Sequence, residues 1–505
     1  AAGGRPMARR GAPAGAMGAE SRRRPRAARR PALWWALTGL VGRAAAETFV
    51  FDEVPVPPGK TLQTQFLFYV YSHEDSPAAR SGPPVVKFDL GLQKIREEGE
   101  GHSIEGYQGL EALVLPRKDL WALVDPSKFC GHADTQGKFV FHEDARPAGV
   151  VRHEISSSHL VEEAEMTGRS GVYVLVLTNC GADLTNVKVS GSVSVQNPHG
   201  FLPAIDYPKK TLFGTLAVLY SVSTLTWLYV ALRWWSELYY VQKGIALINI
   251  TGAIECVLWW LFYYQWNESS EFNSLLFLLA GLSTLWKVMA AFRAVLISSI
   301  SAEPFTVDDE DSDDSLKVHV ALVLYMVCSF NEMTVSAFRH SRALQLDFVL
   351  MNAAPPIAVA SALFLWSHVS LARAITLMKE RRHDADVKLF IRSQAILVLA
   401  TLGGLIVVLL HVFDPTAGDD FDQWSSHWFF SDGAFQLIFF ASLCAAMFTW
   451  LPSQSQGHEY SQVSQAGGDL IGAPSEMVWD SEVDVVDDEV GCGKKVAVKP
   501  MRAAE

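Results

Sequence analysis

Hydrophobic residues are unevenly distributed along this chain of 505 residues, and they concentrate after residue 210. Between Thr211 and Leu451 lie seven apolar segments, each with roughly the 20 residues that a helix needs to cross a bilayer. The segments are 211–232, 244–264, 275–297, 318–338, 348–371, 389–412 and 432–451. The pattern therefore predicts a bundle of seven transmembrane helices.

The pattern before the bundle is different. Short runs rich in β-branched and aromatic residues are separated by Gly, Pro, Asp and Ser. The runs are 61–71, 85–92, 110–115, 138–142, 149–155, 171–178 and 184–196. Short strands punctuated by turn residues are typical of an antiparallel β-sandwich. The predicted fold class is thus a multi-pass α-helical membrane protein with an N-terminal luminal antiparallel β-sandwich.

The N-terminal region has the layout of a secretory signal peptide. A basic run precedes the short apolar core Ala32–Val41, and the small residues Ala44, Ala45 and Ala46 follow. We expect cleavage after Ala46, and an uncleaved signal anchor is the alternative. The predicted domains are a disordered leader and signal peptide (1–46), a luminal β-sandwich (47–208), the seven-helix bundle (209–451) and a cytosolic acidic tail (452–505).

Charged residues in the loops predict the orientation. The loop after the fifth segment carries six basic residues, and the loop after the sixth carries four Asp and no Lys or Arg. Basic loops stay on the cytosolic side. The sandwich is therefore expected in the lumen or outside the cell and the tail in the cytosol. Arg339 and Arg342, after the fourth segment, oppose this assignment but are outnumbered.

Two covalent features are expected in the luminal parts. Cys130 and Cys180 are the cysteines of the sandwich region, and an oxidising compartment would allow a disulfide between them. The alternative is two free buried thiols. Asn267-Glu268-Ser269 forms a glycosylation sequon in the loop after the second segment.

Composition and motifs argue against several functions. The net charge of −12 is unfavourable for nucleic-acid binding. No two His residues stand three or four apart, and there is neither a GxxxxGK loop nor a GxSxG elbow. We expect no enzyme activity, no catalytic residues, no cofactor and no metal.

Ionisable residues inside transmembrane segments are costly and need an explanation. Glu255 in the second segment and Lys287 in the third both fall near the middle of the membrane, so an interhelical ion pair is expected. The pair has two interpretations: a buried contact that holds adjacent helices together, or part of a polar cavity that admits ions, water or a lipid headgroup.

The tail contains a candidate sorting motif. Tyr460-Ser461-Gln462-Val463 fits the pattern of Tyr, two variable residues and a bulky hydrophobic residue. Such a segment can bind as a short extended strand, with pockets for Tyr460 and Val463. The expected partners are clathrin-adaptor-type coat proteins. An acidic cluster at 480–489 is either solvated disorder or a second signal.

Several motifs resemble one family, the transmembrane protein 87 branch of the lung seven-transmembrane receptor superfamily, whose members carry a Golgi-dynamics domain. The matching stretches are Trp234–Gln242, Gly252–Glu255, Asn197–Pro203, Tyr207-Pro208, Lys388–Arg392, Trp424, Trp428, Phe435 and Phe448–Ser453. The chain departs from the family pattern at Glu303-Pro304 and at Leu451, where members carry other residues.

The resemblance implies a protein of membrane traffic. Its members are associated with the Golgi and with endosome-to-Golgi retrograde transport, and their bundle has a lipid-accessible cavity. This chain would then reside in the Golgi membrane and cycle with endosomes or the plasma membrane. It would bind membrane lipids or a luminal cargo protein through the sandwich and the bundle cavity.

Two alternatives from other classes stay open. One is a surface receptor of the G protein-coupled type, although the third segment lacks an Asp/Glu-Arg-Tyr end and the seventh lacks Asn-Pro-x-x-Tyr. The other is a cation channel or a component of a mechanosensing channel, for which the intramembrane pair Glu255 and Lys287 would be the relevant site.

Overall fold

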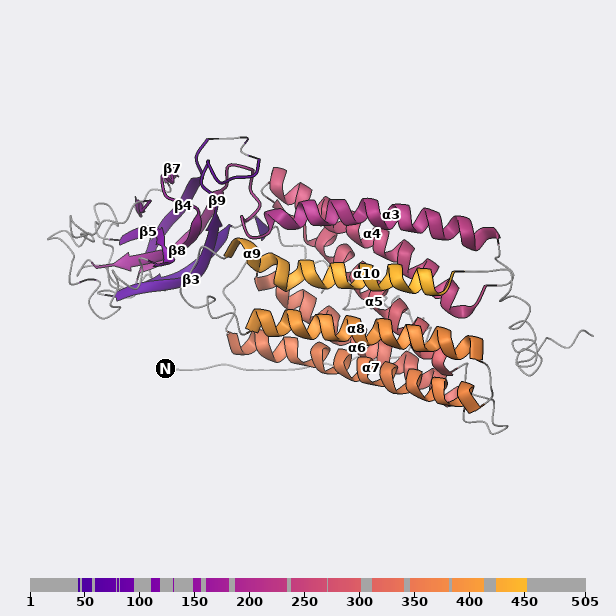
Figure 1. Ribbon diagram of the computed structural model, residues 1–505. Coiled ribbons are helices and arrows are strands. Elements are labelled where there is room, and N and C mark those ends of the chain that lie inside the picture. The colour runs from indigo at the N-terminus through magenta and orange to yellow at the C-terminus, as the bar shows by residue number, and fades with distance from the viewer. Residues whose placement is uncertain are drawn as a thin grey trace, which may run out of the picture.

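The chain forms a β-sandwich that stands at one end of a bundle of long helices (Figure 1). The computed structural model describes residues 44–45, 48–56, 60–78, 80, 82–94, 110–118, 130, 149–155, 160–180, 187–233, 238–269, 271–300, 311–339, 346–380, 384–412 and 424–451. The expected fold class, an antiparallel sandwich before a seven-helix membrane bundle, is confirmed within these residues.

In the described part of the chain, the sandwich consists of two four-stranded antiparallel sheets. One sheet has the order β2-β9-β4-β7 and the other the order β3-β8-β5-β6. The strands are β2 (Phe49–Val56), β3 (Lys60–Val70), β4 (Val85–Lys94), β5 (Leu110–Pro116), β6 (Val151–Glu154), β7 (Leu160–Glu165), β8 (Gly171–Asn179) and β9 (Val187–Gln196). Each sheet takes strands from distant parts of the chain, so neither forms from one continuous segment.

The core between the sheets comes from alternate positions of the strands. Phe68 of β3, Phe88 of β4, Leu175 of β8 and Val193 of β9 are all fully buried there. β8 is buried over nearly its whole length, because Val174 and its neighbours pack into a second apolar cluster on the outer face of that sheet. This explains why its sequence is a continuous apolar run.

Two described strands of the sandwich were not predicted from the sequence pattern, and each has a local reason. In β2 the pairing with β9 shifts register between Phe51 and Val54, and Glu53 between them has a φ of 51°. Such a bulge interrupts the alternation that marks a strand. β7 is an acidic edge strand that pairs only with β4. The predicted strand at 138–142 lies outside the described residues.

Within the described residues the bundle contains seven long helices. Six of them extend beyond the apolar segments, whereas the last is shorter than its segment because a π-helical turn occupies the start of it. The seven helices are α3 (Tyr207–Arg233), α4 (Tyr240–Ser269), α5 (Ser274–Ile300), α6 (Asp311–Arg339), α7 (Leu346–Glu380), α8 (Asp384–Val412) and α10 (Ala434–Thr449). A short helix α9 (Trp424–Trp428) and a π-helical turn η5 (Phe429–Gly433) lead into α10. Polar residues at the helix ends extend the helices beyond their apolar cores.

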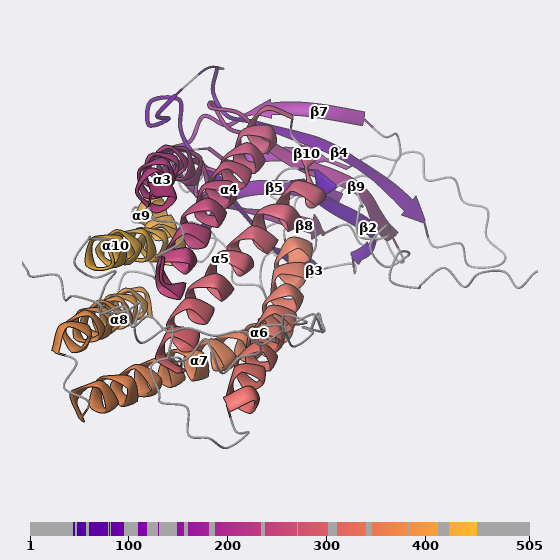
Figure 2. The ribbon, with the colours of Figure 1, turned by 90° about the vertical axis from the view of Figure 1, so that its right-hand side faces the viewer.

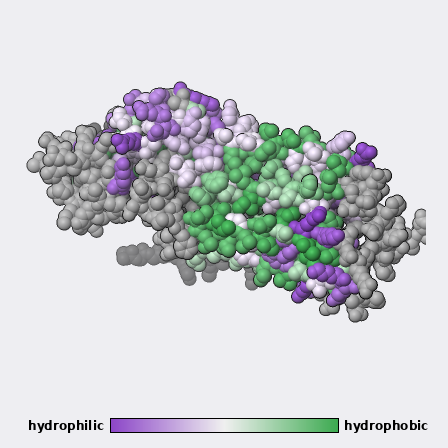
Figure 3. All heavy atoms as spheres, in the orientation of Figure 1, coloured by the Kyte–Doolittle hydropathy of each residue, from purple (hydrophilic) through white to green (hydrophobic). Residues whose placement is uncertain are grey.

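The outward face of the bundle is apolar, as lipid requires. Among the described residues, seven helices are long and apolar enough to cross a membrane. Leu399 and Ile406 on α8 are 69% and 55% exposed, which would be unfavourable in water but suits a lipid-facing surface. In Figure 3 the hydrophobic residues cover the bundle, and hydrophilic residues gather on the sandwich and at the opposite end of the helices.

Helix α4 lies between several other helices of the bundle. It packs along α3 on one side and α5 on the other, and it also contacts α10 (Figure 2). Glycine makes one of these approaches close: a Cβ atom at Gly252 would lie 2.5 Å from the ring of Tyr220 on α3. Several polar side chains of α4, among them Gln242, Asn249 and Glu255, are buried at these contacts.

A short antiparallel pair lies where α4 meets α5. Ala44–Ala45 (β1) pair with Glu271–Phe272 (β10). These alanines belong to the predicted cleavage region, and cleavage after Ala46 would remove β1. The remainder of the predicted signal peptide lies outside the described residues.

Candidate functional site

The centre of the bundle holds a buried ion pair. Lys287 Nζ on α5 lies 2.5 Å from Glu255 Oε2 on α4, and the two side chains are 2% and 0% exposed. The sequence prediction that these residues meet is confirmed. Fully desolvated charges are stable only when they are paired and hydrogen-bonded.

Three further side chains complete this cluster. Gln436 of α10 accepts a hydrogen bond from Lys287 (2.9 Å) and donates one to Glu255 Oε1 (3.1 Å). Thr284 donates its hydroxyl to the same Glu255 oxygen at 2.9 Å, and Trp259 Nε1 donates to Thr284 at 3.0 Å. We call these five residues the central polar cluster. It joins α4, α5 and α10.

Aromatic rings surround the ammonium group of Lys287. Its Nζ atom lies 4.5 Å from the centroid of the Phe439 ring and 5.8 Å from that of Tyr220. Both distances suit cation–π attraction in a desolvated site. The Tyr220 hydroxyl is buried and has no hydrogen-bond partner among the described residues. Aromatic rings therefore border the central polar cluster next to the Lys287 ammonium.

A second polar contact lies between α7 and α8. His368 Nε2 is 3.1 Å from Thr401 Oγ1, and His368 Nδ1 is 3.1 Å from Gln394 Nε2. The side-chain oxygen of Gln394 is buried, and no residue that the structure describes forms a hydrogen bond with it. This site shares no residue with the central polar cluster.

The segment between the sandwich and the bundle is held by its own hydrogen bonds. The Asn197 side chain accepts from Tyr71 N (3.0 Å) and donates to Leu202 O (3.3 Å). His199 Nε2 donates to Leu202 O at 2.9 Å, and its ring packs against Tyr207. We call residues 197–203, with the groups they bind, the junction.

The junction also binds the second membrane helix. Asn267 at the end of α4 donates to His199 O at 2.9 Å, and Phe201 N donates to Asn267 O at 3.0 Å. Gly200 has a φ of 135°, and a Cβ atom there would lie 2.5 Å from Asn267 O. Only glycine permits this approach of the two backbones.

A glycan at Asn267 is incompatible with this structure, which contradicts the sequence prediction. The side chain is 2% exposed, and its amide nitrogen is the atom that donates to His199. The sequon marks residue types but carries no information about burial. The correct assignment of Asn267 is a structural contact between α4 and the junction.

Burial lowers the pKa of His199 to about 4, although the Leu202 carbonyl acts in the opposite direction. The positive charges of Lys210 and Arg80 lower the pKa of His199 further. The imidazole is consequently neutral at pH 7.

An ion-paired lysine ties the first helix to the last. Lys209 Nζ lies 2.9 Å from Asp206 Oδ1 and 2.6 Å from Asp432 Oδ2 in η5. Lys209 and Asp206 are largely buried, at 14% and 13% exposure. The sandwich end of the bundle is thus fastened at α3, α4 and η5.

The structure describes some of the other predicted residues and leaves others outside the described part. Cys130 and Cys180 form the expected disulfide. Tyr460 and Val463 lie outside the described residues. Among those that are described, no group of three or more His, Cys, Asp or Glu side chains is placed to hold a metal ion.

Sequence reasoning missed the partners of the ion pair and the contacts of the junction, although Asn197–Pro203 was singled out by the family resemblance. Gln436 is a polar residue in an apolar helix, and this was a usable signal. Lys209 was missed although Asp432 stands at the start of the seventh apolar segment. Two of the motifs behind the family resemblance meet at the far end of the bundle, where Gln242 Nε2 donates to Trp450 O at 2.9 Å.

Comparisons with known proteins agree with the architecture. Residues 208–457 match the family model for the GOST seven-transmembrane domain. The chain is 25% identical to transmembrane protein 87A of Xenopus tropicalis over 57% of its own length and 52% of that protein. It is 21% identical to human transmembrane protein 87B over 60% of its own length and 54% of that protein.

A yeast relative is also similar. Membrane protein PTM1 of Saccharomyces cerevisiae is 21% identical over 54% of this chain and 53% of that protein. The chain thus spans about half the length of the curated relatives it matches. The membrane domain of this chain belongs to the GOST seven-transmembrane family, and its relatives are consistent with the transmembrane protein 87 branch.

Proposed function

We propose that this protein is a non-enzymatic component of membrane traffic that resides in the Golgi and cycles with endosomes or the plasma membrane. The β-sandwich faces the lumen and binds a cargo protein or lipid, together with the bundle. The tail faces the cytosol and binds coat adaptors. Resemblance to the transmembrane protein 87 family supports endosome-to-Golgi retrograde transport as the step concerned.

The observation that carries this proposal is the rigid junction. Asn267 of α4 binds His199, which follows the sandwich, and Glu268 of α4 pairs with Arg80. At the same end, the Lys209–Asp432 ion pair fastens α3 to η5. A domain held this firmly presents its luminal surface at a fixed height and angle above the membrane. Such an arrangement suits a carrier whose luminal and cytosolic ends must move as one body.

The distribution of charge supports the orientation. Lys379 is in the last turn of α7, and Lys388 and Arg392 are near the start of α8, at the end of the bundle away from the sandwich. Positive charges of this kind favour the cytosolic side. Helix α10, which precedes the tail in sequence, ends at that same end of the bundle.

The tail motif gives the sharpest test. A tagged full-length chain is imaged against Golgi, endosome and surface markers, with surface biotinylation as a second readout. The Tyr460→Ala and Val463→Ala proteins are expected to accumulate at the plasma membrane, because the tail motif loses a side chain that occupies a pocket of the adaptor. Ser461→Ala is the matched control, since it changes a variable position of the motif.

An unchanged distribution of Tyr460→Ala would overturn the adaptor part of the proposal. Absence of the wild-type chain from the Golgi and endosomes would overturn the whole. The alternatives predict other results. A receptor of the G protein-coupled type would stimulate nucleotide exchange when its ligand binds. A cation or mechanosensing channel would conduct in liposomes under voltage or stretch, and Glu255→Gln would alter that current.

A further inference from the structure

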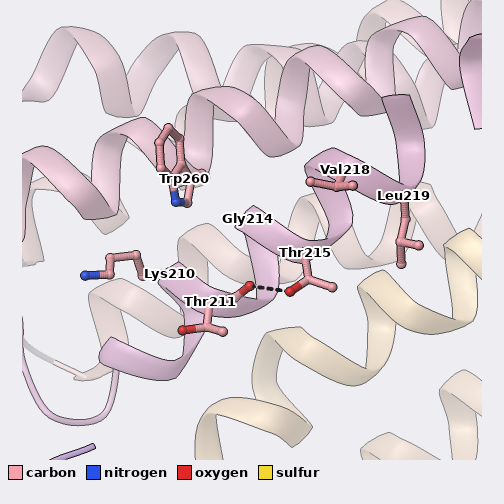
Figure 4. A pocket seen from close by; sticks show the side chains of 7 residues that line it. All are labelled: Lys210, Thr211, Gly214, Thr215, Val218, Leu219 and Trp260. Carbon is pink, nitrogen blue, oxygen red and sulfur yellow. Dashed lines mark hydrogen bonds between the residues drawn. The ribbon is translucent and has the colours of Figure 1, made fainter. Parts of the chain in front are cut away.

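A groove on the outer surface of the bundle runs between α3 and α4. Its cavity has a volume of about 450 Å³ and begins close to the sandwich. Figure 4 shows the side chains that line it, which are Lys210, Thr211, Gly214, Thr215, Val218, Leu219 and Trp260. These residues lie outside the central polar cluster, the junction and the tail.

The groove exists because α3 has no side chain at Gly214. A Cβ atom at this position would lie 3.0 Å from Cδ1 of Trp260 on α4. The indole of Trp260 is 37% exposed and borders the space left by the glycine. Any larger residue at position 214 would therefore fill the groove or displace the indole.

The deeper wall of the groove is apolar and faces outward. Val218 and Leu219 are 64% and 43% exposed on a helix that crosses the membrane. From Lys210 to Leu219 the groove follows ten residues, a rise of roughly 14 Å along the helix. At this depth the surrounding solvent is hydrocarbon, so an acyl chain suits these walls and water does not.

The other end of the groove is cationic. Lys210 is half-buried, and its Nζ atom lies 5.0 Å from the ring centroid of Tyr207 and 6.0 Å from that of Tyr264. Tyrosines of this kind are typical of the level of the lipid headgroups. Across the described part of the chain, no acidic side chain lies within ion-pair distance of Lys210. The nearby Glu268 pairs with Arg80 at 2.6 Å.

We propose that this groove binds one acidic glycerophospholipid from the leaflet on the sandwich side. Lys210 pairs with the lipid phosphate, and the hydroxyl of Thr211 lies at the same end to donate a hydrogen bond. One acyl chain lies along Gly214 and Trp260 and continues past Val218. The combination of an ammonium without a carboxylate partner and a long apolar groove matches the charge and shape of such a lipid.

The test uses the purified full-length chain in nanodiscs of phosphatidylcholine. The probe is phosphatidylglycerol with a photoreactive diazirine on one acyl chain, and phosphatidylcholine with the same chain is the comparison. Cross-linked peptides are mapped by mass spectrometry. We expect the acidic probe to label the Gly214–Leu219 and Trp260 segments, with competition by unlabelled phosphatidylglycerol and none by inorganic phosphate.

Two variants separate the headgroup from the chain. Lys210→Gln is expected to lower labelling by the acidic probe about fivefold and to leave the comparison lipid unchanged. Gly214→Leu is expected to lower labelling by both lipids, because it fills the groove. Lys243→Gln and Val408→Leu are the matched controls, since Lys243 lies at the opposite end of α4 and Val408 is exposed on α8, away from the groove.

Equal labelling by the two lipids, unaffected by Lys210→Gln, would overturn the choice of an acidic lipid. Labelling that maps to other helices would overturn the groove itself. Displacement of the acidic probe by inorganic phosphate would replace the lipid with a free anion. Lys210→Gln should fold normally because it breaks no ion pair, so the test does not depend on the behaviour of Gly214→Leu.

Discussion

The ammonium of Lys287 and the carboxylate of Glu255 lie 2.5 Å apart, and each belongs to a different membrane helix. Gln436 binds both groups, so a third helix depends on the same contact. The pair therefore fixes the mutual rotation of α4, α5 and α10. The structural interpretation of the two intramembrane charges is the one that these contacts favour.

The first prediction concerns this ion pair. Lys287→Met should lower the free energy of unfolding by roughly 3–5 kcal/mol, because it leaves the Glu255 carboxylate buried and unpaired. The double variant Glu255→Gln/Lys287→Met should recover much of that loss, since neither residue is then charged. Thermal unfolding of the detergent-solubilised protein measures both effects.

Lys243→Met is the control for this experiment, because Lys243 is exposed on α4 and lies outside the cluster. It should change the unfolding temperature little. If Lys287→Met were as stable as the wild type, the ion pair would have no structural role and the interpretation as an open polar cavity would gain support.

The architecture could be predicted from the sequence because it depends on the pattern of hydrophobic and polar residues within each segment. Seven apolar segments of bilayer length leave few alternatives to seven helices. Alternation in β9 and the apolar run of β8 identify the strands that form the core of the sandwich. Glu255 and Lys287 could be predicted to pair because each lies near the middle of its apolar segment, and this position can be counted along the chain.

The remaining contacts depend on how the helices are arranged, which no local pattern contains. Gln436 reaches the ion pair from α10, 149 residues along the chain from Lys287. Asn267 was misinterpreted because its sequon is a three-residue pattern, whereas its burial is set by the loop at His199, 68 residues away. β2 was not predicted because the bulge at Glu53 interrupts the alternation of its residues.

The second prediction is that Asn267 carries no glycan. Ser269→Ala destroys the sequon without changing the Asn267 side chain, so its electrophoretic mobility should equal that of the wild type. Asn267→Ala should lower the free energy of unfolding by about 1–3 kcal/mol, because the buried carbonyl of His199 loses its donor. A faster-migrating Ser269→Ala protein would show that a glycan is attached after all.

The third prediction follows from the lowered pKa of His199. An unfolded imidazole titrates near pH 6.5, whereas the folded one stays neutral down to about pH 4. As the pH falls through this interval, the unfolded state gains a proton that the folded state does not bind. His199 should thus cost about 2 kcal/mol of stability by pH 5.

Unfolding temperatures between pH 7.5 and 5 measure this effect. His199→Gln should show a smaller loss on acidification than the wild type, and His73→Gln, which changes an exposed imidazole, should follow the wild type. An identical slope for His199→Gln and the wild type would exclude His199 as the source.

The fourth prediction concerns the disulfide of the sandwich. Cys130 and Cys180 are 50 residues apart, and the loop-closure model assigns about 4 kcal/mol to a bridge of that length. Cys130→Ser/Cys180→Ser should therefore unfold at markedly lower temperature. Cys444→Ser, at an exposed position on α10, is the control. Equal stability of the double variant under non-reducing conditions would contradict the prediction.

The central polar cluster also determines how the protein responds to a membrane potential. A unit charge that crosses the whole bilayer exchanges about 2.3 kcal/mol with a potential of 100 mV. Glu255 and Lys287 carry opposite charges 2.5 Å apart. Against a hydrocarbon thickness of roughly 30 Å, reorienting this dipole exchanges only about 0.2 kcal/mol. As long as the ion pair is formed, these two charges therefore contribute little voltage dependence to the conformation of the bundle.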